Sequence, residues 1–131
     1  MARKPIEFED HPMEFPDKPL YRAYCKHVVD GDTVDVFVDL GLLKYAYESI
    51  RLEGINTPEI YRPKTGEERE AGYKAKEFVE SKILNKQVKI ETLKDKQTFG
   101  RFRANIYFYE DGTWKSLADE LRSNGYDWSE K

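Results

Sequence analysis

The nine residues from Arg51 to Glu59, with the sequence Arg-Leu-Glu-Gly-Ile-Asn-Thr-Pro-Glu, place a cation, an amide, a proline turn and a carboxylate close together. Arg51 ends a run of strand-like residues, and Gly54 allows the backbone to pass close to a neighbouring segment. The Asn-Thr-Pro turn then directs Glu59 back toward the end of the strand. A guanidinium and a carboxylate at the mouth of a small barrel suit phosphate chemistry, although this stretch alone also fits an ordinary charged strand end.

Short runs of alternating apolar residues on both sides of this stretch predict β-strands. They cover residues 21–29, 34–39 and 45–55 before the turn, and residues 88–91 and 104–109 after it. The Asp-Gly-Asp-Thr sequence at residues 30–33 is typical of a turn, so the first two runs are expected to form a hairpin. In the third run Ile50 and Leu52 are expected to face the core, which leaves Arg51 on the opposite face.

Two helices and a polar loop complete the expected fold. Thr65 and Glu68 have the spacing of a capping box, and the apolar residues that follow predict a helix over residues 67–84. Residues 94–100 are expected to form a polar loop, and Ser116 to begin a second helix that stops before Gly125. The order of these elements predicts an α+β, mainly β fold: a five-stranded OB-type barrel with a helix between strands three and four and a second helix near the C-terminus.

The length of 131 residues fits one compact domain and leaves no room for a second full one. Four of the six prolines lie in residues 1–19, which are expected to form an irregular N-terminal arm. Residues 20–126 are expected to form the barrel domain, and residues 127–131 a C-terminal tail. The net charge of -3 argues against a protein that grips nucleic acid over its whole surface, although a local basic site is compatible with it.

The single cysteine, Cys25, excludes an intramolecular disulfide. No apolar run approaches the roughly 20 residues of a membrane span, and the first residues lack the apolar segment of a signal peptide. A cytoplasmic location is therefore expected, with secretion left open if the chain is a processed form. A monomer without membrane contact is the expected state.

Polar groups from distant parts of the chain are expected to meet at one mouth of the barrel. They are Asp32, Arg51, Asn56, Thr57, Glu59 and Arg101. Side-chain and backbone oxygens with a phosphate oxygen form a site for a hard cation, and Ca²⁺ accepts such a set in looser geometry than Mg²⁺. Glu59 can then take a proton from a water beside the metal. Arg51 and Arg101 can hydrogen-bond the phosphoryl oxygens as charge builds there.

Three separated motifs resemble the staphylococcal nuclease (thermonuclease) family. They are Asp30-Gly31-Asp32-Thr33-Val34, the stretch from Arg51 to Thr57-Pro58-Glu59, and Phe99-Gly100-Arg101. The motifs follow the family's order with about its spacing, and the resemblance runs over about residues 21–125. It implies an OB-fold barrel that hydrolyses phosphodiester bonds of DNA and RNA with Ca²⁺ and leaves 3′-phosphate products.

The resemblance also implies a role for each matching residue. It makes Asp32 a metal ligand through its carboxylate and Thr57 one through its backbone carbonyl. Glu59 becomes the general base, or the group that orients the water, and Arg51 and Arg101 stabilise the transition state. Asn56 departs from the family pattern, because the best-known members have a metal-ligating aspartate at this position. An amide oxygen can still coordinate, but with one negative charge fewer we expect weaker calcium binding or a changed metal preference.

The sequence therefore predicts a calcium-dependent, thermonuclease-like endonuclease acting on DNA and/or RNA. The rival interpretation is a catalytically weak or inactive nucleic-acid-binding OB module. Asn56 favours the rival, as does Phe99, which replaces a tyrosine of the family. The joint presence of Asp32, Glu59 and two arginines favours catalysis. Six further cations are expected either to form a basic rim that attracts a polyanion or to be ordinary solvated charges: Arg62, Lys64, Arg69, Lys94, Lys96 and Arg103.

Overall fold

The computed structural model describes residues 20–98 and 101–129, and the side chains of residues 94–98 are not part of that description. The expected N-terminal arm, Phe99 and Gly100 lie outside the described residues. The elements, in chain order, are β1 (Leu20–Asp30), β2 (Thr33–Asp39), β3 (Tyr45–Leu52), α1 (Gly66–Ile83), β4 (Gln87–Thr98), β5 (Arg101–Glu110), β6 (Thr113–Ser116) and α2 (Leu117–Ser123).

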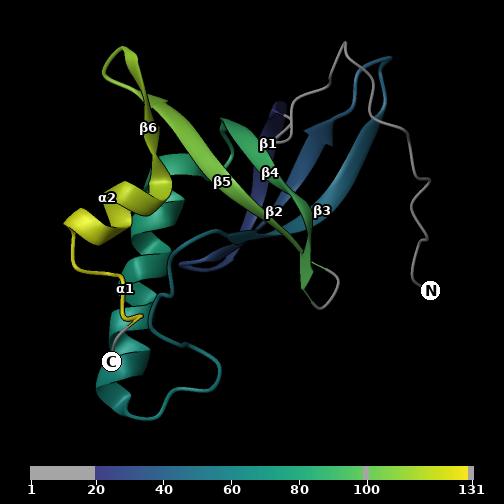
Figure 1. Cartoon of the computed structure of the whole chain (residues 1–131). Helices are drawn as coiled ribbons and strands as arrows, with labels where there is room; N and C mark the ends of the chain where they lie inside the picture. The colour runs from purple at the N-terminus through teal and green to yellow at the C-terminus, as the bar shows by residue number, and fades with distance from the viewer. Residues whose placement is uncertain (1–19, 99–100, 130–131) are drawn as a thin grey trace.

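The strands form one sheet in the order β3-β2-β1-β4-β5-β6, and a parallel pairing of β3 with β5 closes the first five strands into a barrel. In Figure 1 both helices lie on the left of the barrel, while the hairpin of β2 and β3 projects on the right. The predicted α+β fold with a five-stranded OB-type barrel is confirmed. In the described part of the chain, no helix is long and apolar enough to cross a membrane.

Alternation along the strands builds the barrel core. Val34, Val36 and Val38 point inward from β2, and Ile50 and Leu52 point inward from β3 as predicted. Branched side chains suit this position because they pack well on a pleated surface. From α1, the buried residues Gly72, Ala75, Val79 and Ile83 form one face of the helix. Val79 and Ile83 of α1 belong to the same core as the inward side chains of the strands, and α1 packs against β1.

The predicted N-cap of α1 at Thr65 is confirmed, whereas the Glu68 side chain of the expected capping box bonds the backbone N–H of Lys64 rather than that of Thr65. The Thr65 hydroxyl accepts a hydrogen bond from the backbone N–H of Glu68 at 3.0 Å. The Glu68 carboxylate in turn accepts from the backbone N–H groups of Lys64 at 2.6 Å and Glu59 at 3.4 Å. The start of α1 is thereby attached to the turn that carries Glu59.

The structure differs from the sequence-based expectation in three strands. β3 ends at Leu52 rather than at residue 55, because Gly54 turns the chain with a φ of +76°. The expected polar loop over residues 94–100 is wrong for residues 94–98. These residues continue β4, and after an irregularity in the register Gln97 and Thr98 pair with β5. β6 was not predicted, since its four residues become a strand only by pairing with β5 across a two-residue turn.

Replacing the capping threonine tests this account of α1. We expect Thr65→Ala to lower the free energy of unfolding by about 1 kcal/mol, because the N–H of Glu68 loses its acceptor. Urea denaturation measures the change, and Thr113→Ala, at an exposed position of β6, is the matched control. Equal effects of the two substitutions would contradict a capping role.

Candidate functional site

The turn between β1 and β2 is the centre of the site. The backbone N–H of Asp32 donates to the Asp30 carboxylate at 3.1 Å, which stabilises the turn. A Cβ on Gly31 would lie 2.8 Å from the side chain of Thr57 and 2.9 Å from the Cβ of Ala75. Only glycine therefore allows the turn to approach both the segment after β3 and helix α1.

The Asp32 side chain is buried, with 7% of its surface exposed. One carboxylate oxygen accepts from the Thr33 hydroxyl at 3.1 Å, and the other accepts from the backbone N–H of Thr57 at 3.1 Å. A guanidinium nitrogen of Arg51 lies 3.4 Å from that second oxygen. A buried carboxylate needs such partners. Asp32 therefore ties the β1–β2 turn to β3 and to the segment after β3.

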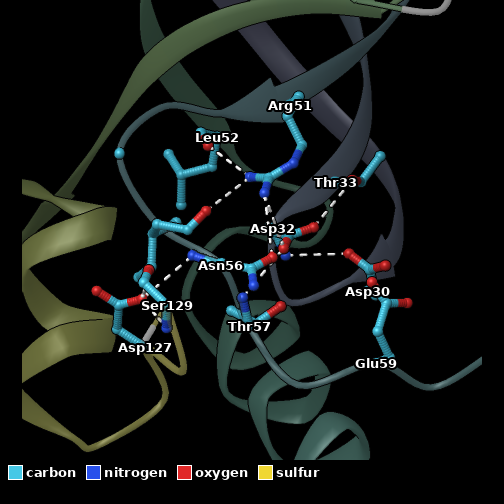
Figure 2. A network of polar contacts seen from close by, with 12 residues as sticks. Asp30, Asp32, Thr33, Arg51, Leu52, Asn56, Thr57, Glu59, Asp127 and Ser129 are labelled. Atoms are coloured by element: carbon cyan, nitrogen blue, oxygen red, sulfur yellow. Dashed lines mark hydrogen bonds and ion pairs between the residues drawn. The ribbon is translucent and has the colours of Figure 1, made fainter. Parts of the chain in front are cut away.

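Arg51 is held at the end of β3 by several acceptors (Figure 2). Its Nη1 donates to the backbone carbonyls of Leu52 at 2.7 Å and Ile55 at 2.9 Å. Its Nη2 faces Asp32 and donates to the side-chain oxygen of Asn56 at 3.4 Å. The guanidinium is thus positioned by backbone groups on one side, while its other side faces the oxygens of the site.

Arg101, at the start of β5, reaches the same place from another strand. Its Nη1 donates to the Thr33 hydroxyl oxygen at 3.2 Å, and that hydroxyl donates to Asp32. The two arginines are therefore linked to one carboxylate, Arg51 directly and Arg101 through Thr33. The parallel pairing of β3 with β5 makes this possible, because it brings the beginning of β5 beside the end of β3.

Asp30 and Glu59 form an acidic side of the site. Figure 2 shows the exposed Glu59 beside Asp30, on the opposite side of Asp32 from Asp127. Burial, together with the hydrogen bond and charge of Asp32 and the charge of Glu59, raises the pKa of Asp30 to about 7. The negative charge of these groups is incompletely compensated by the protein. Sequence analysis did not select Asp30, although it lies two residues before Asp32.

Asn56 is held by the C-terminal segment. Its backbone N–H donates to the Asp127 carboxylate at 3.2 Å, and its carbonyl accepts from the backbone N–H of Trp128 at 2.8 Å. Burial raises the pKa of Asp127, but hydrogen bonds from Ser129 and Asn56 and the charge of Arg122 outweigh it and leave that pKa below its ordinary value. Residues 127–129, expected only as a tail, therefore support the site.

The oxygens gathered here suit a hard cation. The carboxylates of Asp30 and Asp32, the amide oxygen of Asn56 and the carbonyl of Thr57 are ligand types that Ca²⁺ accepts. The Thr57 hydroxyl is buried and has no hydrogen-bond partner in the described structure. Among residues 20–98 and 101–129, no group of three or more His, Cys, Asp or Glu residues could hold a metal ion alone. A cation would therefore need neutral oxygens and oxygens of a bound substrate.

The expected basic rim is only partly open to a ligand. Arg103 makes an ion pair with Glu53 at 2.7 Å, so its charge is already matched. Arg62, Lys64 and Arg69 are exposed near the start of α1. Lys94 and Lys96 lie where side chains are not described. The arginines that face the central carboxylate remain the best-defined cations of the site.

Two comparisons with known proteins agree with this geometry. A family model described as staphylococcal nuclease homologue matches residues 49–131, which is more than half of the chain. The uncharacterized protein MJ1439 of Methanocaldococcus jannaschii is 35% identical over 124 residues, which covers 81% of this chain and 58% of that protein. The chain thus spans little more than half the length of this relative. We conclude that the chain belongs to the staphylococcal nuclease homologue family.

Proposed function

We propose that this chain is a calcium-dependent nuclease that hydrolyses phosphodiester bonds of DNA and/or RNA. The observation that carries the proposal is the connection of Arg51 and Arg101 to the buried carboxylate of Asp32. Two guanidinium groups beside an acidic turn match the needs of phosphoryl transfer, in which negative charge grows on the phosphoryl oxygens. Family membership supports a nuclease of this type.

The proposed metal ligands are the carboxylate of Asp32, the amide oxygen of Asn56 and the backbone carbonyl of Thr57. Asp30 adds negative charge beside them. A bound Ca²⁺ ion would supply positive charge that polarises a phosphoryl oxygen and makes a nearby water more acidic. Asp32 is well suited to this role, because its hydrogen bonds fix the carboxylate before any cation arrives.

Glu59 is the proposed general base. Its exposed side chain lies beside Asp30, at the open side of the site, where a water can enter (Figure 2). Glu59 takes a proton from this water as the oxygen attacks phosphorus. The bond from phosphorus to the leaving ester oxygen breaks, and this oxygen takes up a proton from solvent to leave as an alcohol. A positioned general base contributes about 10² to 10⁴ in rate.

Arg51 and Arg101 are the proposed stabilisers of the transition state. The two contacts of Arg51 Nη2, with Asp32 and Asn56, are both long at 3.4 Å. Contacts of this length are weak as hydrogen bonds, so Nη2 can turn a donor toward a phosphoryl oxygen while the guanidinium stays beside Asp32. The shorter bonds of Nη1 to backbone carbonyls keep the group in place meanwhile. Arg51 is thus oriented in advance and still has donors for the substrate.

A second candidate function is nucleic-acid binding without cleavage. The observation that favours it is the hydrogen bond from Arg51 to Asn56, because this amide oxygen is then shared between the arginine and any metal. Such a module would bind nucleic acid with salt-dependent affinity and leave it intact at every calcium concentration. Incubation with single-stranded DNA and calcium, with and without EDTA, separates the two functions.

Removing the proposed base should abolish most cleavage. We expect Glu59→Gln to lower kcat for single-stranded DNA by about 10² to 10⁴, because the amide cannot take the proton. The wild-type cleavage should stop on addition of EDTA. Glu67→Gln, at an exposed position in the first turn of α1, is the matched control and should keep full activity. Undiminished turnover by Glu59→Gln would remove this residue from its role.

Restoring a charge at position 56 should strengthen metal binding. We expect Asn56→Asp to bind calcium about tenfold more tightly, because charge count tunes the affinity of such sites. Isothermal titration calorimetry measures the dissociation constant. Asn85→Asp, at an exposed position after α1, adds the same charge far from the site and serves as control. An unchanged dissociation constant for Asn56→Asp would place this residue outside the metal ligands.

The acidic turn should make the metal-free protein pH-sensitive. The pKa of the Asp30 carboxyl is about 7 in the folded protein and 3.8 in the unfolded chain. Folding therefore favours the protonated form of this carboxyl. The stability this provides is complete below about pH 4 and is lost as the pH rises through 7. We therefore expect Asp30→Asn to stabilise the protein in EDTA at pH 8, with a smaller advantage at pH 4.

Urea denaturation at both pH values tests this expectation. Glu70→Gln, exposed on α1, is the control for a general loss of negative charge. A destabilising effect of Asp30→Asn at pH 8 would show that the carboxylate form is the one favoured by the fold.

A further inference from the structure

On the outer face of β1, β2 and β3, the exposed side chains of Tyr24, Phe37 and Tyr47 occupy paired positions, and we call these three residues the aromatic row. The strand register pairs Tyr24 with Phe37 and Phe37 with Tyr47, so the rings lie next to one another across the three strands. Their exposed fractions are 42%, 40% and 52%, and the ring centroids of Phe37 and Tyr47 are 4.7 Å apart. A contiguous exposed apolar surface of this kind is typical of a binding site.

The aromatic row lies on the same face of the sheet as Arg51. Side chains alternate along a strand, so Tyr47, Ser49 and Arg51 of β3 point to one side while Ile50 between them is buried in the core. Arg51 lies four positions after Tyr47, which corresponds to about 13 Å along the strand. The aromatic row is therefore a continuation of the surface that ends at the candidate catalytic site.

The carboxylates of β2 on this face are each matched by a group from β1. Asp35 lies 3.2 Å from the Nδ1 of His27, between the aromatic row and Arg51. Asp39, on the other side of the row, lies 3.5 Å from a guanidinium nitrogen of Arg22. The Arg22 guanidinium reduces the repulsion that a polyanion would meet from Asp39, and His27 does the same for Asp35 when it is protonated.

We propose that the aromatic row is a subsite for single-stranded nucleic acid, in which unpaired bases stack on Tyr24, Phe37 and Tyr47. The placement of the cleaved phosphate at Arg51 rests on the proposed function, whereas stacking on the rings does not. Stacking on aromatic side chains tolerates every base, because each base has a π-face. OB folds use the surface of the equivalent strands for oligonucleotides. In a duplex the base faces are already covered by neighbouring bases, so a single strand is the preferred substrate.

Geometry favours bases over a protein surface as the occupant. A protein partner, including a second copy of this chain, would require only apolar area. The aromatic row instead places three rings at paired positions of neighbouring strands, and it leads toward two arginines that are suited to phosphate. A strand held by its bases on the row would place a phosphate at the site a few nucleotides away.

Binding without cleavage tests this inference. Fluorescence anisotropy in EDTA would compare a dinucleotide with a single strand of about twelve nucleotides, a length within the range of OB-fold sites. The double variant Phe37→Leu with Tyr47→Leu keeps apolar area but removes both rings. We expect it to bind the long strand about tenfold more weakly than the wild type, with dinucleotide binding unchanged. Tyr109→Leu, exposed by 58% on β5, is the matched control and should bind as the wild type does.

The outcomes separate this inference from the proposed function. If the double variant binds the long strand as tightly as the wild type, the subsite is overturned, whether or not the protein cleaves DNA. If the variant loses affinity while the wild type cuts nothing in calcium, the subsite stands and the proposed catalysis fails. A wild-type dimer that the double variant converts to a monomer, seen by analytical ultracentrifugation, would assign the row to a second copy and overturn the inference.

Discussion

The buried carboxylate of Asp32 is the interaction on which the site depends. Its three partners come from the start of β2, the end of β3 and the segment that follows β3. Removing a buried carboxylate from water is unfavourable unless such donors are present. The chain therefore has to bring Thr33, Arg51 and Thr57 together wherever Asp32 is buried. The contacts that stabilise the buried carboxylate therefore also bring together the groups that are suited to bind phosphate.

Glycine and the C-terminal segment make this arrangement possible. Gly31 lets the turn pass within contact distance of Thr57 and α1, where any larger residue would push the segment away. On the other side, Asp127 holds the backbone of Asn56 across a sequence separation of 71 residues. The site is thus supported by α1 from one side and by the C-terminal segment from the other. Its oxygens are held close to fixed positions, as binding of a cation requires.

Local patterns predicted much of this structure, whereas features created by distant contacts could not be predicted. Alternation revealed the five barrel strands and the outward direction of Arg51, and the spacing of Thr65 and Glu68 revealed the start of α1. β6 is too short to be recognised without its partner strand. The perturbed pKa of Asp30 arises from burial and from neighbours that only the folded chain provides. Nothing near Asp127 in the sequence indicates that it contacts Asn56. The metal ligands and the catalytic roles stay predictions.

A crystal structure with calcium and a nucleoside 3′,5′-bisphosphate would test the central claim most directly. The account predicts metal density bounded by the Asp32 carboxylate and the Thr57 carbonyl, with a phosphate oxygen completing the ligands and both Arg51 and Arg101 donating to that phosphate. Calcium bound elsewhere, or a phosphate that leaves both arginines on their protein partners, would contradict it.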